Sequence, residues 1–463
     1  MDDNLILMTD SYKVTHWKQY PPGTEYVYSY FESRGGKWDT TCFFGLQYIL
    51  KRYLCGQVIT QAKIDQAEDF FRDHLGQNCF NRHGWEHILH RHDGRLPIVI
   101  KAVPEGEIVT NRNVLITVEN TDPQCYWLPN YLETLLVQVW YPSTVATNSR
   151  EQKKIIDKWM KKTGCGNMAV EFKLHDFGFR GVSSVETAGI GACAHLINFR
   201  GTDTMAGLVC ARKYYCCPMA GYSIPASEHS TMTSWGEAGE IDAYRNMLEK
   251  YPTGLVACVS DSWNVFHACS QLWGNELRDQ VMRRDGTLAI RPDSGDPATT
   301  VCRVLDIVGS IEDPTAGFGK DVSITATGHR LLPKYIRIIQ GDGIDADSLE
   351  HILSMAADRG WASDNLAFGS GGALLQRMNR DTLKFAFKCS HVTISGESRD
   401  VHKDPVTDPG KRSKAGRLCL IKQDGWKTVT ATTHPEDKLV EVFRDGSLLI
   451  EWTLDDVRLR ATI

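Results

Sequence analysis

The 463-residue sequence contains no apolar run as long as the roughly 18–20 residues that a membrane-spanning helix needs. It has no excess of basic charge either: the net charge is −5, which argues against a general nucleic-acid-binding protein but permits a local basic pocket. The start, Met1-Asp2-Asp3-Asn4, lacks the positive region of a secretion signal. The fourteen cysteines form no C-x-x-C motif, and many, such as Cys193 and Cys258, lie in apolar surroundings. We therefore expect reduced core thiols and a cytoplasmic protein without membrane or nucleic-acid partners.

What is present is the composition of an ordinary globular protein, with 42% hydrophobic and 24% charged residues. The length is too great for one small core and predicts two or three domains. The first 145 or so residues mix short elements, and no internal repeat is found. Their patterns predict strands over 26–31, 96–103 and 114–118, and helices over 61–74, 131–140 and 149–162.

From about residue 170 the pattern changes to a repeated order of strand, polar turn and helix. Strands are predicted over 172–174, 255–259, 288–290, 336–339 and 366–368, with helices such as 262–272 and 298–308 between them. Alternating strands and helices imply a parallel sheet. Polar residues that follow the strands are typical of an α/β barrel or of a doubly wound sheet, and periodicity alone does not separate the two.

The most informative turn follows the strand that ends in Ile290-Arg291-Pro292-Asp293-Ser294-Gly295. Pro292 cannot continue a strand ladder, and Gly295 permits a sharp bend. Arg291 and Asp293 are two residues apart, so in extended backbone they point to the same side. A cation that binds anions in bidentate fashion, beside a carboxylate, suits a phosphorylated sugar with a metal ion. A surface salt bridge is the alternative for this turn taken alone.

Two further stretches fit the same interpretation. Gly369-Ser370-Gly371-Gly372 lies between a predicted strand and a predicted helix, so its backbone N–H groups suit a phosphate; a tight glycine turn is the alternative. Arg380 and Lys388 follow downstream as candidate counter-charges. His229 follows a turn that contains Pro225, a plausible strand-end position for a functional histidine, although a lone histidine is more often structural.

Three other motifs are weaker. Asp176-Phe177-Gly178 resembles a kinase motif, but the kinase catalytic loop and strand lysine are missing. The glycines of 189–194 match a loose dinucleotide fingerprint, but no strand precedes them, so helix packing is the better explanation. His83-Gly84-Trp85-Glu86-His87 matches the inverted zinc-protease pattern, yet it contains a glycine and no third ligand is identifiable. A polar helix start on the surface is the favoured interpretation there.

After Arg380 the sequence becomes rich in strands and turns. Residues 403–405 and 411–414 form a basic loop region, and 439–450 predict a hairpin around Arg444-Asp445-Gly446. We expect this tail to pack back on the first domain.

Taken together, these stretches closely resemble the nicotinamide phosphoribosyltransferase family, which consists of type II phosphoribosyltransferases. The resemblance runs nearly from end to end. The motifs that carry it are Thr9–His16, Phe44–Tyr48, Ala146–Glu151, His175–Gly181, Gly201–Thr204, Glu228–Ser230, Ile290–Gly295, Gln340–Gly343 and Gly369–Gly372.

The resemblance implies an α/β barrel that carries the active site, joined to an α+β sandwich-like domain built from both chain ends. The expected boundaries are 1–147 for the N-terminal part of the sandwich-like domain, 148–384 for the barrel, and 385–463 for the returning C-terminal segment.

It also implies a reaction and its site. Nicotinamide and phosphoribosyl diphosphate would give nicotinamide mononucleotide and diphosphate, with Mg²⁺, in NAD salvage.

The resemblance also assigns roles to individual residues. Nicotinamide would lie between Phe177 and Tyr12 of a second subunit in a homodimer, and Asp203 would accept its amide N–H. Arg180, His229 and Arg291 would surround the diphosphate, and Asp293, Gly341 and Asp342 would hold the ribose. Gly371, Gly372, Arg380 and Lys388 would hold the 5′-phosphate, with Arg34 of the partner. His229, Asp293 and Arg291 are the predicted catalytic residues, and ATP is an expected co-substrate that phosphorylates His229.

This sequence departs from the vertebrate members in three respects. Ala386 and Ala257 stand where those enzymes have serine, and the segment after Arg34 is shorter. The main rival function is that of a nicotinate phosphoribosyltransferase, which the Asp203 carboxylate disfavours because it would repel the carboxylate of nicotinate. A non-catalytic binding or signalling protein is the other alternative, and the intact Arg180, Arg291 and Asp293 argue against it.

Overall fold

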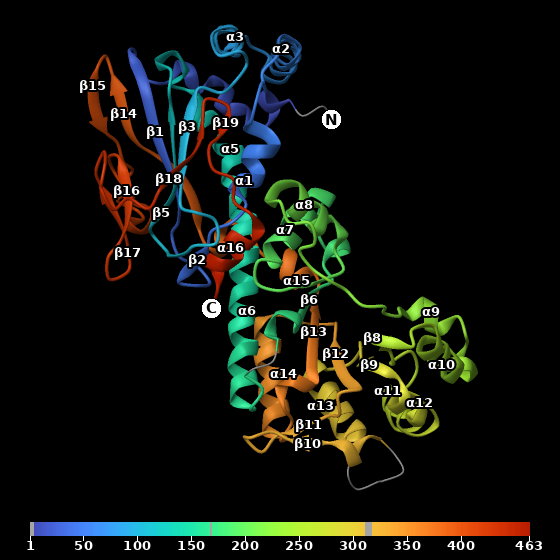
Figure 1. The fold of residues 1–463 in the computed structure, drawn as a ribbon. Coiled ribbons are helices and arrows are strands. Elements are labelled where there is room, and N and C mark those ends of the chain that lie inside the picture. Colours follow the sequence, from blue (N-terminus) through green and yellow to red (C-terminus); the bar gives the residue numbers. More distant parts are fainter. Residues whose placement is uncertain (1–3, 167–168, 311–316) are drawn as a thin grey trace. The chain divides into compact units, whose positions relative to one another are not determined.

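The computed structural model describes residues 4–166, 169–310 and 317–463, and these fold into two compact units (Figure 1). The first unit comprises the described residues up to Thr147, with Arg212–Cys217 and Met378–Thr462. The second comprises Asn148–Ala211 and Pro218–Arg377. Within the described ranges, no helix has the length and apolar character needed to cross a membrane. All fourteen cysteines lie in these ranges, none of them forms a disulfide bond, and most are buried.

The first unit is built on a seven-stranded antiparallel sheet that joins the two ends of the chain. In spatial order the strands are β15 (Glu397–Asp400), β14 (Phe385–Ile394), β1 (Thr24–Ser33), β5 (Val114–Asn120), β3 (Ile98–Ala102), β18 (Val440–Arg444) and β19 (Ser447–Leu448). The register of β1 against β14 runs from Thr24 opposite Ile394 to Ser33 opposite Phe385. Figure 1 shows these strands of opposite chain ends side by side.

The remaining elements of this unit surround the sheet. The helices are α1 (Leu46–Ile49), α2 (Gln61–Leu75), α3 (Arg82–Arg91), α4 (Leu128–Tyr131), α5 (Glu133–Leu136) and α16 (Leu454–Ala461), with short helical turns that include η2 (Ser11–Lys18) and η12 (Arg380–Thr382). Two further ribbons pair β2 (Thr40–Cys42) with β4 (Ile108–Thr110) and β16 (Leu418–Lys422) with β17 (Trp426–Thr430). The predicted strands, the helix over 61–74 and the C-terminal hairpin are confirmed.

The largely buried helix predicted over 131–140 is found in interrupted form. The chain forms α4, α5 and a short 3₁₀ turn with helical backbone at the joints, and α6 (Trp140–Lys162) begins where the predicted helix was to end. The Tyr131 carbonyl accepts a hydrogen bond from the Thr9 hydroxyl at 3.0 Å, which ties this stretch to the N-terminal segment. Pro142 lies in the first turn of α6, where proline is tolerated because its missing N–H has no helical partner.

The second unit contains a six-stranded parallel sheet. In spatial order its strands are β7 (Gly201–Thr202), β6 (Leu174–Asp176), β13 (Leu366–Ser370), β12 (Ile336–Gln340), β9 (Asp285–Arg291) and β8 (Thr253–Val259). The segment 222–226 bridges both edges: Tyr222 pairs with Gly201, and Ala226 pairs with Ala257. The sheet therefore curls round on itself, which decides for the α/β barrel and against an open doubly wound sheet.

Helices cover the outside of this sheet (Figure 1). They are α7 (Val185–His195), α8 (Met205–Tyr215), α9 (His229–Thr233), α10 (Glu240–Lys250), α11 (Val265–His267), α12 (Arg278–Arg283), α13 (Pro297–Val308), α14 (Ala346–Asp358) and α15 (Gly372–Leu375). Buried apolar side chains of α13 and α14, with Trp273 and Trp361, form the main core against the strands. Gly189 of α7 would place a Cβ only 3.4 Å from the Ala206 carbonyl, so helix packing does explain that glycine.

Candidate functional site

The carboxyl ends of the parallel strands gather the side chains that the sequence singled out. At the first two strands, Phe177 and Arg180 follow β6 and Asp203 follows β7, while His229 begins α9 after the bridging segment. Arg291 is the last residue of β9, and Asp293 follows it. Gly341 and Asp342 follow β12, and Gly371 and Gly372 follow β13. Parallel strands present their carboxyl ends at one edge of the sheet, and this is where α/β barrels carry their sites. The second unit alone therefore assembles most of the predicted set.

Around Gly341 the predicted residues are in direct proximity. A Cβ placed on Gly341 would lie 3.1 Å from Asp293 Oδ1, 3.5 Å from the Phe177 ring and 3.7 Å from Arg291 Cδ. Arg291 and Asp293 lie on the same side, as predicted, with Nε 3.6 Å from Oδ1. Arg291 Nε is buried and has no hydrogen-bond partner among the described residues. A buried guanidinium with an unused donor suits an anionic ligand.

Asp293 is surrounded by charges of both signs. Burial raises the pKa of its carboxyl group, and Arg291 acts in the opposite direction. The carboxylates of Asp261 and Asp342 also raise this pKa, because like charges disfavour the ionised form. Asp261 and Asp342 therefore each lie near Asp293. Carboxylate oxygens are the hard ligands that Mg²⁺ prefers, so the donor chemistry around Asp293 suits a magnesium ion.

His229 has a partner that the sequence analysis missed. Its Nε2 lies 3.0 Å from Asp261 Oδ1, and the Asp261 side chain is only 4% exposed, whereas that of His229 is 48% exposed. A carboxylate can only accept, so Nε2 carries the hydrogen, and in the neutral form of the ring the lone pair is on Nδ1. Asp261 belongs to the polar turn after β8, so the strand-end pattern could have identified it.

Asp203 lies in a polar group at the ends of β6 and β7. Its carboxylate accepts a hydrogen bond from the Ser223 hydroxyl, and its backbone N–H donates to the Asp176 carbonyl at 2.9 Å. The pKa of Asp176 is raised to about 6, mainly by burial and also by the nearby Asp203, against hydrogen bonds that include one from the Gly178 N–H. Asp203 is exposed and is the acceptor that remains open to a ligand.

Phe177 packs over the interior of the barrel. It contacts a small apolar cluster formed by Ala257, Ala289 and Ile339. Next to this cluster lies a cavity of about 540 Å³ whose lining includes His175, Tyr222, Ser223, Ile224, Ala289, Ile339 and Ala367. Ala257, one of the departures noted in the sequence, thus lies in the barrel interior beside the predicted ring-binding residue.

The glycine loop after β13 is shaped by close approach of backbone to backbone. A Cβ on Gly181 would lie 3.3 Å from the Gly372 N, and one on Gly371 would lie 3.6 Å from the Phe177 carbonyl. The helix expected here, α15, has only four residues, so its dipole contributes little. Arg180 lies in the adjoining turn and is exposed. The loop can offer backbone N–H groups to a phosphate, but not the end of a long helix.

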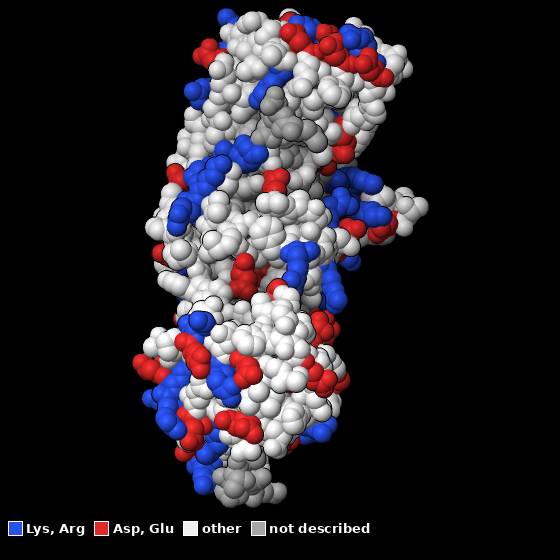
Figure 2. Space-filling model, turned by 90° about the vertical axis from the view of Figure 1, so that its right-hand side faces the viewer, with Lys and Arg blue, Asp and Glu red and all other residues white. Residues whose placement is uncertain are grey.

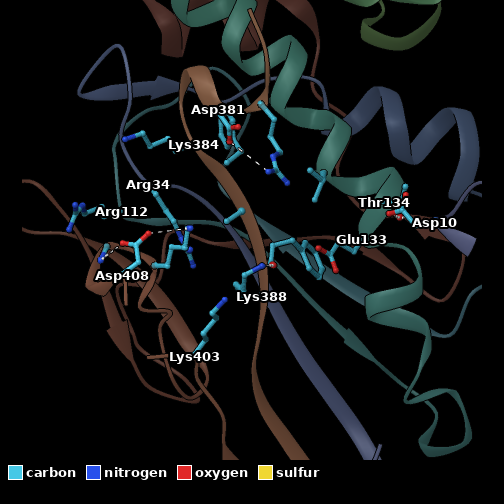
Figure 3. A pocket seen from close by; sticks show the side chains of 17 residues that line it. Asp10, Arg34, Arg112, Glu133, Thr134, Asp381, Lys384, Lys388, Lys403 and Asp408 are labelled. Atoms are coloured by element: carbon cyan, nitrogen blue, oxygen red, sulfur yellow. Dashed lines mark hydrogen bonds and ion pairs between the residues drawn. The ribbon is translucent and has the colours of Figure 1, made fainter. Parts of the chain in front are cut away.

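The other predicted phosphate ligands lie in the first unit, where they line one pocket of about 660 Å³ (Figure 3). Seven cationic side chains line it: Arg34, Arg112, Arg380, Lys384, Lys388, Lys403 and Lys411. They face four acidic ones: Asp10, Glu133, Asp381 and Asp408. The excess of positive charge suits an anion. Lys403 and Lys411 come from the basic loop region, and the sequence analysis assigned them no role.

Two residues report directly on the electrostatics of this basic pocket. Burial lowers the pKa of Lys388, and the nearby Arg34, Arg380 and Lys403 lower it further. The Arg34 Nε lies 2.9 Å from Glu32 Oε1, while its Nη2 is buried without a hydrogen-bond partner among the described residues. Arg34, which the resemblance assigns to a partner subunit, thus shares a pocket with Arg380 and Lys388 of its own chain.

Tyr12 lies on η2 in the first unit and is 60% exposed. Its ring makes an edge contact with His16, with 4.8 Å between the centroids. A large exposed aromatic side chain of this kind is suited to an interface. Among the described residues, Tyr12 is not one of those that line the basic pocket of its own unit.

Charge elsewhere is mixed. On the face shown in Figure 2, basic and acidic side chains of the described residues form small separate groups. This distribution agrees with the net charge of −5 and differs from the long basic surface typical of nucleic-acid-binding proteins.

The curled parallel sheet with cations and carboxylates at its carboxyl edge defines the class of the protein as a phosphoribosyltransferase fold. Two solved structures share it. One is a nicotinate-nucleotide pyrophosphorylase from Pyrococcus furiosus, with a TM-score of 0.60 and 15% identity over 100% of this chain and 95% of that chain. The other is human nicotinic acid phosphoribosyltransferase, with a TM-score of 0.54 and 15% identity over 98% of this chain and 93% of that chain. Identities this low establish the fold alone.

Sequence comparison then gives the family. The model of the nicotinate phosphoribosyltransferase family matches residues 172–447, and that of the nicotinamide phosphoribosyltransferase N-terminal domain matches residues 4–100. The nicotinamide phosphoribosyltransferase of Xanthomonas campestris is 48% identical over 99% of this chain and 98% of its own. That of Acinetobacter baylyi is 34% identical over 99% of this chain and 97% of its own. The chain belongs to the nicotinamide phosphoribosyltransferase family and is a pentosyltransferase.

Proposed function

We propose that this enzyme transfers the 5-phosphoribosyl group of phosphoribosyl diphosphate to nicotinamide, giving nicotinamide mononucleotide and diphosphate in NAD salvage. The observation that carries the proposal is the gathering of Phe177, Asp203, Arg291 and Asp293 at one edge of the barrel. An aromatic ring, an amide acceptor, a guanidinium and a carboxylate are the groups that a pyridine amide and a pyrophosphorylated sugar require.

The nicotinamide ring is proposed to stack on Phe177, with its amide N–H donating to Asp203. The exposed carboxylate of Asp203 supports this assignment, because it is fixed by Ser223 and keeps acceptor capacity. Nicotinate would place a second carboxylate against it, and the repulsion disfavours that substrate. Relatives that match 99% of this chain are named nicotinamide phosphoribosyltransferases, which supports this choice of substrate.

The sugar and the leaving group are proposed to bind around Gly341. The ribose hydroxyls would donate hydrogen bonds to the carboxylates of Asp293 and Asp342. Gly341 would let the sugar approach closely, because its missing Cβ leaves room beside Asp293 Oδ1. Arg291, with its unused buried donor, and the exposed Arg180 and His229 would hold the diphosphate. Asp293, with Asp261 and Asp342 nearby, would hold Mg²⁺, which neutralises charge on the diphosphate when bound.

The 5′-phosphate is proposed to bind in the basic pocket, at Arg380, Lys388 and Arg34, the last of which the resemblance assigns to a partner subunit. The unused Nη2 of Arg34 and the lowered pKa of Lys388 support an anion in the basic pocket. Ala386 lines the same pocket and offers no hydroxyl, so its cations carry the binding.

The reaction breaks the bond from the anomeric carbon to the diphosphate oxygen, and the departing oxygen takes the electron pair. The pyridine nitrogen uses its own lone pair to form the new bond to carbon, so no general base is needed. Arg291 and the other cations stabilise the charge that develops on the leaving group, and Phe177 and Asp203 hold the ring in line.

A direct assay tests this function. The wild-type enzyme is expected to prefer nicotinamide over nicotinate by roughly 10³-fold or more in kcat/KM, because nicotinate lacks the amide N–H that Asp203 accepts and brings a like charge against its carboxylate. Asp203→Asn is expected to lose most of that preference, while Asp242→Asn, a change at an exposed acid of α10, should retain it. Turnover of nicotinate by the wild type at a comparable kcat/KM would contradict the assignment and favour the nicotinate function.

We further propose a homodimer in which Tyr12 of one subunit completes the ring site of the other. The 60% exposure of the Tyr12 side chain supports this role. A Tyr12→Ala protein mixed with an Arg291→Ala protein should recover up to about a quarter of wild-type activity, because half of the randomly exchanged dimers would carry one intact site. Activity that stays at the mutant level after demonstrated subunit exchange would show that Tyr12 does not act across the interface.

ATP is proposed as an activating co-substrate that phosphorylates His229. The lone pair on Nδ1, the ring nitrogen that Asp261 does not hold, supports a nucleophilic role.

We also propose a reducing, cytoplasmic setting for the enzyme. None of the fourteen cysteines forms a disulfide bond, which supports this setting.

A further inference from the structure

Two histidines and one aspartate of the first unit come together away from the basic pocket. His87 lies on α3, His92 is the residue that caps the carboxyl end of this helix, and Asp122 follows β5. His87 Nε2 is 2.8 Å and His92 Nε2 is 2.7 Å from the same oxygen, Oδ2 of Asp122. The three candidate ligand atoms all lie within 4.8 Å of one another.

The inverted zinc-protease motif did not predict this cluster. Glu86 forms an ion pair with Arg82 at 2.7 Å, and the His83 side chain is exposed, so neither joins His87. The partners of His87 are instead five residues further along the chain and in a loop between two other elements. Sequence spacing alone could not have shown this set, because Asp122 reaches it only through the fold.

Hydrogen bonds from the surrounding chain orient the Asp122 carboxylate, so that Oδ2 faces the two histidines. Asp122 Oδ1 accepts the Gln124 N–H at 2.8 Å, and the Asp122 carbonyl accepts from the Asn120 side chain at 2.8 Å. Only Oδ2 approaches His87 and His92, so the three candidate ligand atoms are one carboxylate oxygen and two ring nitrogens.

The elements that carry these residues are firmly packed. Trp85 of α3 is fully buried and makes an edge contact with Trp127, with 4.7 Å between the ring centroids. The side chains of His87, His92 and Asp122 are 12%, 25% and 18% exposed, so the cluster is partly open to water. A rigid set of three ligands with one open side matches a zinc site that keeps a water molecule as its fourth ligand.

We propose that His87, His92 and Asp122 bind a divalent transition-metal ion, with Zn²⁺ the best fit. Zinc bonds of about 2.0–2.2 Å place tetrahedral ligand atoms roughly 3.3–3.6 Å apart, so the two N–O distances would need to widen by roughly 0.5–0.9 Å when the ion binds. Two imidazoles select zinc or a neighbouring transition metal over Mg²⁺ or Ca²⁺, which favour oxygen ligands. The bound ion joins the carboxyl end of α3 to the loop after β5 and stabilises the first unit.

Zinc binding to the chelator-treated, full-length protein tests the proposal. Isothermal titration with ZnCl₂ should give one site per chain, and Co²⁺ should give the visible absorption of a tetrahedral complex. His92→Ala and Asp122→Asn should each weaken binding by about tenfold or more, because each removes one of three ligands. His90→Ala, a change at an exposed histidine of the same helix, should bind as the wild type does.

His229→Ala serves as a second control, because His229 and Asp261 form the other histidine–carboxylate pair considered above. Zinc should also raise the midpoint of thermal unfolding by about a few degrees in the wild type and in both control variants, but not in His92→Ala. If His92→Ala does not fold, Asp122→Asn supplies the comparison.

Absence of a stoichiometric zinc site in the wild type would overturn the proposal. So would equal zinc affinity in the wild type, His92→Ala and Asp122→Asn, which would indicate binding elsewhere. In either case the three side chains would form only a hydrogen-bonded brace.

Discussion

His229→Ala is expected to abolish ATP hydrolysis and the enhancement of turnover by ATP, while leaving a weak ATP-independent reaction. The Asp261 carboxylate holds Nε2–H at 3.0 Å, which leaves the Nδ1 lone pair to attack the γ-phosphorus of ATP. The bond from that phosphorus to the bridging oxygen breaks, and ADP departs. The phosphohistidine would add negative charge that Mg²⁺ and the nearby arginines could pair, and we expect this to tighten binding of the sugar donor.

The measurement is incubation with γ-labelled ATP, followed by steady-state assays with and without ATP. Wild-type protein should carry label that is lost in acid and kept in base. Asp261→Asn should reduce labelling, because the imidazole loses the group that sets its tautomer. His351→Ala, a change at an exposed histidine of α14, should behave as the wild type does. Undiminished label on His229→Ala would assign phosphorylation to another residue and leave His229 as a diphosphate ligand.

Arg291→Ala is expected to lower kcat/KM by about 10²–10³-fold, the usual effect of removing a preorganised donor that stabilises developing charge. The buried Nε, which has no hydrogen-bond partner among the described residues, is the reason to expect so large a loss. Arg291→Lys should restore only part of the activity, since a lysine cannot form the bidentate contact.

Diphosphate binding separates this role from a structural one. Arg291→Ala should weaken inhibition by the product diphosphate while leaving the thermal midpoint within about a few degrees of the wild type. Arg283→Ala provides the control, because its ion pair with Asp279 is exposed and worth little. Unchanged diphosphate affinity in Arg291→Ala would remove Arg291 from the leaving-group site.

Several elements could be predicted because their signals are local. The hairpin at Asp445-Gly446 needs two residues at positive φ, and both have it, at 47° and 79°. The strand that ends in Arg291 and the Asp293 turn likewise depend on neighbours in sequence, and their side chains do lie on one side. The helix expected over 131–140 is interrupted in the structure, and its Tyr131 carbonyl accepts a hydrogen bond from Thr9, a contact that no local pattern contains.

The sequence by itself determined three things: the alternation of strands and helices that implies a parallel sheet, the positions of the strand-end residues and, through its motifs, the family. The tertiary structure alone decided how these pieces close and combine. Pairing of Tyr222 with β7 and of Ala226 with β8 closes the barrel, Asp261 meets His229, and Lys403 joins Lys388 in the basic pocket. Each of these contacts joins residues far apart in the chain. Their formation depends on packing and register across the whole unit, whereas turn chemistry and periodicity act over only a few residues.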